Sequence, residues 1–256
     1  MRGAKGFTLV ELVMVIVILA IVATISVQFV SLSTRGALDV SARQQRALQG
    51  VVIGEQLSRQ LREAFPLSIR VSGQCLEWLP VLAATNYIHR TQGPGFDKID
   101  IVPFSQVPAA GNRALIYGYG ATTSELYGST NPGPVSTPIA GIAGGTITLS
   151  SAHRFRQQSP ERRLYVIGSP VSVCQNGRML YRYSGYGRTT SQPSPPTGGV
   201  REVMSANLSG PVDFRFTPPT YQRAAVVEFA LTLKDYDTGS DETTTTRQEV
   251  QIRNVP

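Results

Sequence analysis

Residues 6–30 have the sequence GFTLVELVMVIVILAIVATISVQFV, and this stretch decides the class of the protein. From Phe7 to Val30 it is apolar apart from Thr8, Glu11, Thr24, Ser26 and Gln28. Neither Gly nor Pro interrupts these 24 residues. As a helix they would be about 36 Å long, which is enough to cross a lipid bilayer. The stretch therefore predicts a transmembrane helix.

The charges near this helix indicate its direction. Arg2 and Lys5 precede it, which places the N-terminus in the cytoplasm by the positive-inside rule. A secretory signal would have a shorter apolar core, followed by small residues at a cleavage site. A plain membrane anchor would account for the apolar run but not for Glu11, because an unpaired carboxylate near the start of an apolar span is costly. Glu11 is therefore a functional candidate.

The segment GFTLVE at residues 6–11 resembles the class III signal of type IV prepilins, in which a short basic leader ends in Gly and an apolar helix follows. The resemblance implies that prepilin peptidase cuts between Gly6 and Phe7 and methylates the new amine of Phe7. It also implies that Glu11 pairs with the Phe7 amine of a neighbouring subunit. Opposite charges attract strongly in a medium of low dielectric, so this pair would fix the register between subunits.

The same resemblance implies an α+β fold with four parts. Residues 1–6 are a cytoplasmic leader, 7–30 a transmembrane and filament-core helix, 31–65 the amphipathic half of that helix, and 66–256 a periplasmic β-rich domain. The implied partners are prepilin peptidase, other minor and major pilins, the inner-membrane assembly platform and the membrane itself. The implied location is the bacterial inner membrane, and then the pilus at the cell surface.

The second half of the helix is predicted by an apolar stripe at Ile53, Leu57, Leu61 and Ala64. Pro66 limits the helix to residues 7–64, about 87 Å of helix. The alternative is two helices, separated at Gly36 or at the Gly50 and Gly54 pair, since each internal Gly weakens a helix by about 1 kcal/mol.

Short apolar or alternating runs after residue 66 predict antiparallel strands separated by Gly, Pro, Asn and Ser. The expected strands are Cys75–Val81, Ile99–Phe104, Ala114–Tyr119, Thr146–Leu149, Leu164–Ile167, Val171–Cys174, Met179–Tyr183, Val212–Phe216, Val226–Leu233 and Glu249–Val255. Two long loops are expected at Gly120–Gly145 and Ser184–Gly199. Loops of this length are uncommon in a compact domain unless they bind something or cover a neighbour.

The chain has two cysteines, Cys75 and Cys174, and neither has another Cys or His at metal-ligand spacing. If the domain lies outside the cytoplasm, one disulfide that closes a long loop is expected, and two buried free thiols are the alternative.

Three segments further resemble the O-type minor subunits of the mannose-sensitive haemagglutinin pilus system, and less closely the J-type pseudopilins of type II secretion. They are Cys75–Pro80, Gly177–Tyr183 and Gln248–Pro256. The absence of proline between Phe7 and Phe65 also favours a minor pilin or pseudopilin, because many major pilins have a kinking proline there.

Other kinds of site have little support. His89 and His153 are the only histidines, and no HExxH, GxSxG, phosphate-binding loop or paired-carboxylate arrangement is present, so we expect neither an enzyme nor a cofactor.

Asp235, Asp237, Asp241 and Glu242 form a weak calcium candidate, with a simple turn as the alternative.

Nucleic acid is an unlikely partner. The formal net charge of +7 is spread along the chain without a long basic run. Aromatic and basic residues do alternate at Tyr181, Arg182, Tyr183, Tyr186 and Arg188, and such a cluster could stack on single-stranded DNA. Strand residues followed by a turn are the alternative.

The sequence therefore predicts a minor pilin of a type IV pilus that helps to prime assembly near the filament tip. The alternatives are a J-type pseudopilin of type II secretion and, less favoured, a DNA-capturing minor pilin.

Overall fold

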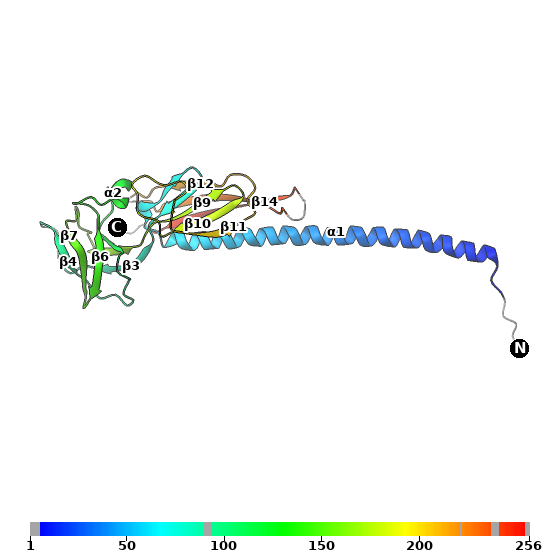
Figure 1. The fold of residues 1–256 in the computed structure, drawn as a ribbon, viewed down its shortest axis with the longest axis horizontal. Coiled ribbons are helices and arrows are strands. Elements are labelled where there is room, and N and C mark those ends of the chain that lie inside the picture. Colours follow the sequence, from blue (N-terminus) through cyan, green and yellow to red (C-terminus); the bar gives the residue numbers. More distant parts are fainter. Residues whose placement is uncertain (1–5, 90–93, 221, 237–240, 254–256) are drawn as a thin grey trace. The chain divides into compact units, whose positions relative to one another are not determined.

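The structure is a computed structural model that describes residues 6–89, 94–220, 222–236 and 241–253 (Figure 1). The chain divides into two compact units, Met1–Leu48 and Gln49–Pro256, and each is described by itself. The described part of the first unit is mostly helix, and the strands among the described residues lie in the second unit. A long N-terminal helix followed by an antiparallel, β-rich domain confirms the predicted α+β class.

Helix α1 (Leu9–Arg62) is continuous, so the alternative of two helices is not found. It is shorter at both ends than the predicted range of residues 7–64. At its C-terminus the amides of Glu63 and Ala64 bond to carbonyls only three residues back. The amide of Phe65 then bonds to the carbonyl of Leu79, which takes the backbone out of the helix before Pro66.

Gly50 and Gly54 have a packing role in α1. A Cβ atom on Gly50 would overlap the Oγ1 of Thr246, and one on Gly54 would overlap the Oε1 of Gln248. Both partners lie on strand β14 (Thr243–Ile252). Gly50 therefore allows the helix backbone to approach this strand closely, whereas the neighbour of Gly54 is the flexible end of the Gln248 side chain.

Two antiparallel sheets pack with residues 49–62 of α1, and together we call them the helix–sheet module (Figure 1). The five-stranded sheet has the order β1 (Arg70–Ser72), β2 (Cys75–Trp78), β9 (Val171–Asn176), β10 (Met179–Ser184), β11 (Val200–Ser205). The three-stranded sheet has the order β12 (Asp213–Thr217), β13 (Ala225–Lys234), β14. Ile53, Leu57 and Leu61 of the helix lie in the same buried core as apolar residues of both sheets.

The remaining six strands form a barrel between β2 and β9. They are β3 (Val81–Asn86), β4 (Phe96–Asp100), β5 (Arg113–Leu115), β6 (Val135–Ala143), β7 (Thr146–His153) and β8 (Arg163–Ile167). Their order is β3-β8-β5-β6-β7-β4. An antiparallel bridge between Tyr87 and Ile101 joins the ends of β3 and β4, which closes the ring. Apolar side chains from around the ring fill one buried cluster inside it.

The barrel wall also packs against the residues that directly follow α1 and β2. Leu115 of β5, Tyr165 and Ile167 of β8 and Val135 of β6 lie in one buried cluster with Phe65 and Leu79. The rings of Phe65 and Tyr165 are 5.9 Å apart. Strands β2 and β9 are antiparallel neighbours, like the two strands of a β-hairpin. The barrel strands lie between them in the sequence, in the position where a hairpin has its turn.

The expected loop Gly120–Gly145 is wrong, because it contains helix α2 (Thr123–Tyr127) and strand β6. Strand β6 contains Pro138 and Gly141, residue types that are uncommon inside strands, and they made the segment resemble a loop. The register shifts between Ile139 and Gly141, where β6 pairs with β7. A capping box between Thr122 and Glu125 starts α2. That Thr-x-x-Glu pattern was a usable signal. Strands β1 and β11 and the part of β3 after Val81 were also missed, since the expected strand Cys75–Val81 divides into β2 and the start of β3. Ser184–Gly199 is irregular apart from Ser184, which ends β10.

The close approach at Gly50 makes a testable prediction. Gly50→Leu should lower the free energy of unfolding by about 1–3 kcal/mol, because the added side chain must displace β14 from the helix. Denaturant unfolding followed by circular dichroism measures the change. Val51→Leu is the control, since Val51 is the next residue of the helix and its side chain is exposed. Equal midpoints for the two variants would contradict the close packing.

Candidate processing and assembly site

The first helical turn is defined by Thr8. Gly6, Phe7 and Thr8 are not helical, and α1 begins at Leu9. The Oγ1 of Thr8 accepts a hydrogen bond from the amide of Glu11 at 3.3 Å, and its carbonyl accepts one from the amide of Leu12 at 3.2 Å. Thr8 is therefore the N-cap and Glu11 the third helical residue, an arrangement in which Thr and Glu are favoured.

The bond between Gly6 and Phe7 lies in an open, non-helical segment. A Cβ atom built on Gly6 meets nothing within 4 Å, and Phe7 is 77% exposed. A peptidase can bind backbone of this kind without unfolding a helix. Residues 1–5 of the expected leader, including Arg2 and Lys5, lie outside the described residues.

Glu11 is exposed and is the acidic residue of the first turn of α1. The unpaired amides of a helix N-terminus carry partial positive charge, which favours a carboxylate at this position. This local role does not explain why the acid stands within the apolar run that begins at Phe7. A second group of positive charge would satisfy the carboxylate in a membrane or a helix bundle.

Large apolar side chains surround this site on all sides of the helix. Leu9, Val10, Leu12, Met14 and Ile16 are each more than half exposed, and the pattern continues through Phe29 and Val30. Among the described helices, α1 is long and apolar enough to cross a membrane. Within its first unit, the helix has no protein core of its own to bury these side chains.

Residues 1–27 match the family described as the prokaryotic N-terminal methylation motif. This chain carries an N-terminal methylation signal. The match supports a type IV pilin-like protein of a structural rather than an enzymatic class, and it covers the leader, Phe7, Glu11 and most of the apolar run. No curated protein and no solved structure matches the chain.

Cys75 and Cys174 are joined in a disulfide across 99 residues of sequence. They face each other on the paired strands β2 and β9, at the end of the pairing away from the barrel, whereas Trp78 and Val171 form the pair nearest to it. Cys75 is 3% exposed and Cys174 is fully buried. The disulfide therefore ties together the strands that enter and leave the barrel.

The weak calcium candidate gains no support. Asp241 forms an ion pair with Lys234 at 2.6 Å, and the strands β13 and β14 on either side form a hairpin. Asp237 lies outside the described residues. Across residues 6–89, 94–220, 222–236 and 241–253, no three His, Cys, Asp or Glu side chains gather as a metal site.

The aromatic and basic cluster is largely built into the fold. Tyr183 and Tyr186 are each 5% exposed, so neither presents an open face for a base. Arg188 donates to the carbonyl of Leu126 at 2.7 Å. The guanidinium of Arg201 stacks on Tyr181 with 4.5 Å between the Arg Cζ and the ring centre. This packing favours the alternative of strand residues followed by a turn.

The histidines do not meet. His89 is exposed, whereas buried His153 bonds to the carbonyl of Gly133 at 3.1 Å. Burial lowers the pKa of His153, so its ring stays neutral near pH 7.

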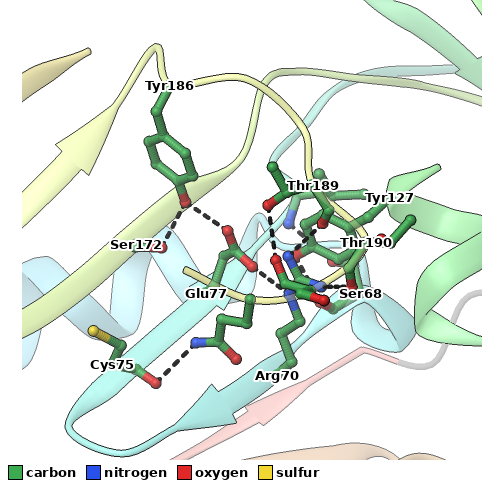
Figure 2. A network of polar contacts seen from close by, with 12 residues as sticks. Ser68, Arg70, Cys75, Glu77, Tyr127, Ser172, Tyr186, Thr189 and Thr190 are labelled. Atoms are coloured by element: carbon green, nitrogen blue, oxygen red, sulfur yellow. Dashed lines mark hydrogen bonds and ion pairs between the residues drawn. The ribbon is translucent and has the colours of Figure 1, made fainter. Parts of the chain in front are cut away.

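Sequence analysis missed a buried charge at Glu77, which is fully buried and paired with Arg70 (Figure 2). The hydroxyl of Tyr186 donates to the Oε1 of Glu77 at 2.8 Å. Glu77 stands between Leu76 and Trp78 in a strand that is buried on both faces. An acid in such a run was the available signal, because a buried charge requires a partner.

Thr8→Ala should speed hydrogen exchange at the Glu11 amide about fivefold, because it removes an N-cap worth about 1 kcal/mol. Exchange is measured by NMR on the chain in detergent micelles. Thr8→Ser, which retains the hydroxyl, is the control and should match the unmodified chain. An unchanged rate in Thr8→Ala would show that Thr8 does not cap the helix.

Proposed function

We propose that the protein is a minor pilin of a type IV pilus, of the mannose-sensitive haemagglutinin kind, that helps to prime filament assembly near the tip. Prepilin peptidase cleaves it between Gly6 and Phe7 and methylates Phe7. The apolar part of α1 holds it in the inner membrane with the globular domain in the periplasm. The same helix then enters the filament among other pilins.

The observation that carries this proposal is the N-terminal motif on an exposed apolar helix. The motif provides a cleavable Gly–Phe bond, and Glu11 follows in the first helical turn. A helix whose apolar side chains are exposed all round must be buried either in lipid or among other helices. A subunit that moves from the membrane into a helical filament core meets both conditions.

Glu11 provides the register in this mechanism. The Phe7 amine of one subunit and the Glu11 carboxylate of another are both costly when unpaired in an apolar medium. Only one axial offset between neighbouring helices satisfies both groups. The pair therefore selects one helix register rather than strengthening every contact equally.

Glu11→Gln should leave cleavage after Gly6 intact and reduce incorporation into pili by about tenfold or more, because a buried amine is then left without its counter-charge. Immunoblots of membranes and of sheared pili measure both steps. Asp39→Asn is a matched control, since it removes an exposed acidic charge elsewhere on the same helix. Equal incorporation of the two variants would contradict the register role.

The barrel supports a minor rather than a major role. A subunit repeated throughout a filament must pack its globular part against neighbours on every side. An added barrel spanning residues 81–167 needs space at each repeat. At a filament end that space is open, which favours a subunit of low copy number near the tip.

The decisive experiment is deletion of the gene, followed by counts of sheared pili and assays of secreted proteins from the same culture. Loss of pili with normal secretion is expected. Normal pili with failed secretion would identify a J-type pseudopilin and overturn the proposed system.

A further inference from the structure

Residues 185–199 connect β10 to β11, and we call them the strap. Strands β10 and β11 are paired antiparallel neighbours, so a tight turn could join them. The strap is instead 15 residues long, from the end of β10 at Ser184 to the start of β11 at Val200. Figure 2 shows part of it, with Tyr186, Thr189 and Thr190, beside β1 and β2.

The strap covers one face of the five-stranded sheet. Leu76, Trp78 and Val173 on the other face belong to the core that contains α1. Because side chains alternate along a strand, Cys75, Glu77 and Cys174 point the opposite way. They are nevertheless almost fully buried, and Cys75 and Cys174 share a buried apolar cluster with Tyr186 of the strap. The strap is therefore part of what separates the disulfide from solvent.

Polar contacts fasten the strap along its length (Figure 2). Arg70 donates to the carbonyls of Thr189 at 2.9 Å and Thr190 at 2.7 Å while pairing with Glu77. The guanidinium of Arg70 also lies over the Tyr127 ring, with 3.6 Å between the Arg Cζ and the ring centre. Burial raises the pKa of Tyr186, so its hydroxyl remains a donor to Glu77.

Two further contacts lie directly beside the disulfide. The Nε2 of Gln192 donates to the carbonyl of Cys75 at 3.1 Å, and the Oγ of Ser194 donates to the carbonyl of Ser72 at 3.0 Å. Cys75 and Ser72 are paired across the β1–β2 hairpin. The strap thus bonds to the backbone of the β2 cysteine and to that of the residue paired with it on β1.

We propose that the strap is a gate on the Cys75–Cys174 disulfide, and that thiol–disulfide exchange at this bond requires the strap to lift from the sheet. The bond forms before the strap closes and is then protected from exchange. Because the bond joins β2 to β9, the strands that enter and leave the barrel, the closed strap also protects this link between them. This inference is independent of the assembly role proposed above.

The chemistry of the gate is ordinary exchange. In formation, a donor protein disulfide takes two electrons from the thiols of Cys75 and Cys174 and leaves as a dithiol. In reduction, a thiolate of dithiothreitol attacks one cysteine sulfur and releases the other as a thiolate. The second thiol of the reagent then displaces the first cysteine and closes a cyclic disulfide. Both directions need a free approach to a sulfur atom.

The test measures how fast dithiothreitol reduces the disulfide in the folded, full chain in detergent without denaturant. New thiols are trapped at intervals with a polyethylene-glycol maleimide and counted on a gel. The unmodified chain should react at least tenfold more slowly than oxidised glutathione under the same conditions. Tyr186→Ala should react at least tenfold faster than the unmodified chain, because it removes the ring that packs with the two cysteines.

Arg182→Gln is the matched control. Arg182 lies on β10 close to the strap, yet it pairs with Glu202 and with Gln60 of α1 on the opposite face of the sheet. Its loss removes a charged contact of the same sheet without touching the strap, so its rate should stay within about twofold of the unmodified chain. An unchanged rate in Tyr186→Ala, or an equal acceleration in Arg182→Gln, would overturn the gate.

A second variant tests the proposal even if Tyr186→Ala does not fold. The double variant Gln192→Ala and Ser194→Ala removes only two side-chain contacts of the strap. It should accelerate reduction severalfold with an unchanged urea midpoint, since reduction then follows local opening rather than global unfolding. Acceleration only in proportion to a loss of global stability would contradict a local gate.

Discussion

Helix α1 must satisfy two different surroundings with one continuous backbone, and the rest of the structure depends on this constraint. From Leu9 to Val30 it presents large apolar side chains in every direction. Around Ile53 to Leu61 it buries a single stripe, and Gly50 and Gly54 remove side chains where β14 approaches. Apolar side chains all round suit the first part of the helix to an apolar medium, and a single apolar stripe suits the second part to packing on a sheet.

The features that followed from the sequence are those that depend on local pattern. The long helix, the α+β class and many of the strands repeat periods of 3.6 or 2 residues, and Glu11 was visible because an acid does not fit an apolar run. The helix is two residues shorter at each end than expected, because the Thr8 side chain caps its N-terminus and the Phe65 amide bonds to the carbonyl of Leu79. At the C-terminal end of the helix the bond depends on Leu79, which lies in a later segment of the chain. At the N-terminal end it depends on the single hydroxyl of Thr8.

The features that did not follow depend on contacts between distant residues. Closure of the barrel requires Tyr87 to meet Ile101 and β3 to pair with β8 across the length of the insertion. Glu77 is buried only because Arg70 and a loop more than a hundred residues later supply its partners. Neither arrangement has a periodicity, so the polarity of Glu77 alone could only show that some partner exists.

The closed ring of the barrel has a consequence for a protein whose helix is suited to self-association. An open sheet presents unpaired N–H and C=O groups that can add strands from other copies, and chains then associate in an uncontrolled order. Where Tyr87 pairs with Ile101, just beyond the ends of β3 and β4, the backbone groups of the first and last strands of this ring bond to each other. In the assembly proposed above, the joined ends of the ring would therefore leave fewer free backbone groups for strands of other copies to pair with.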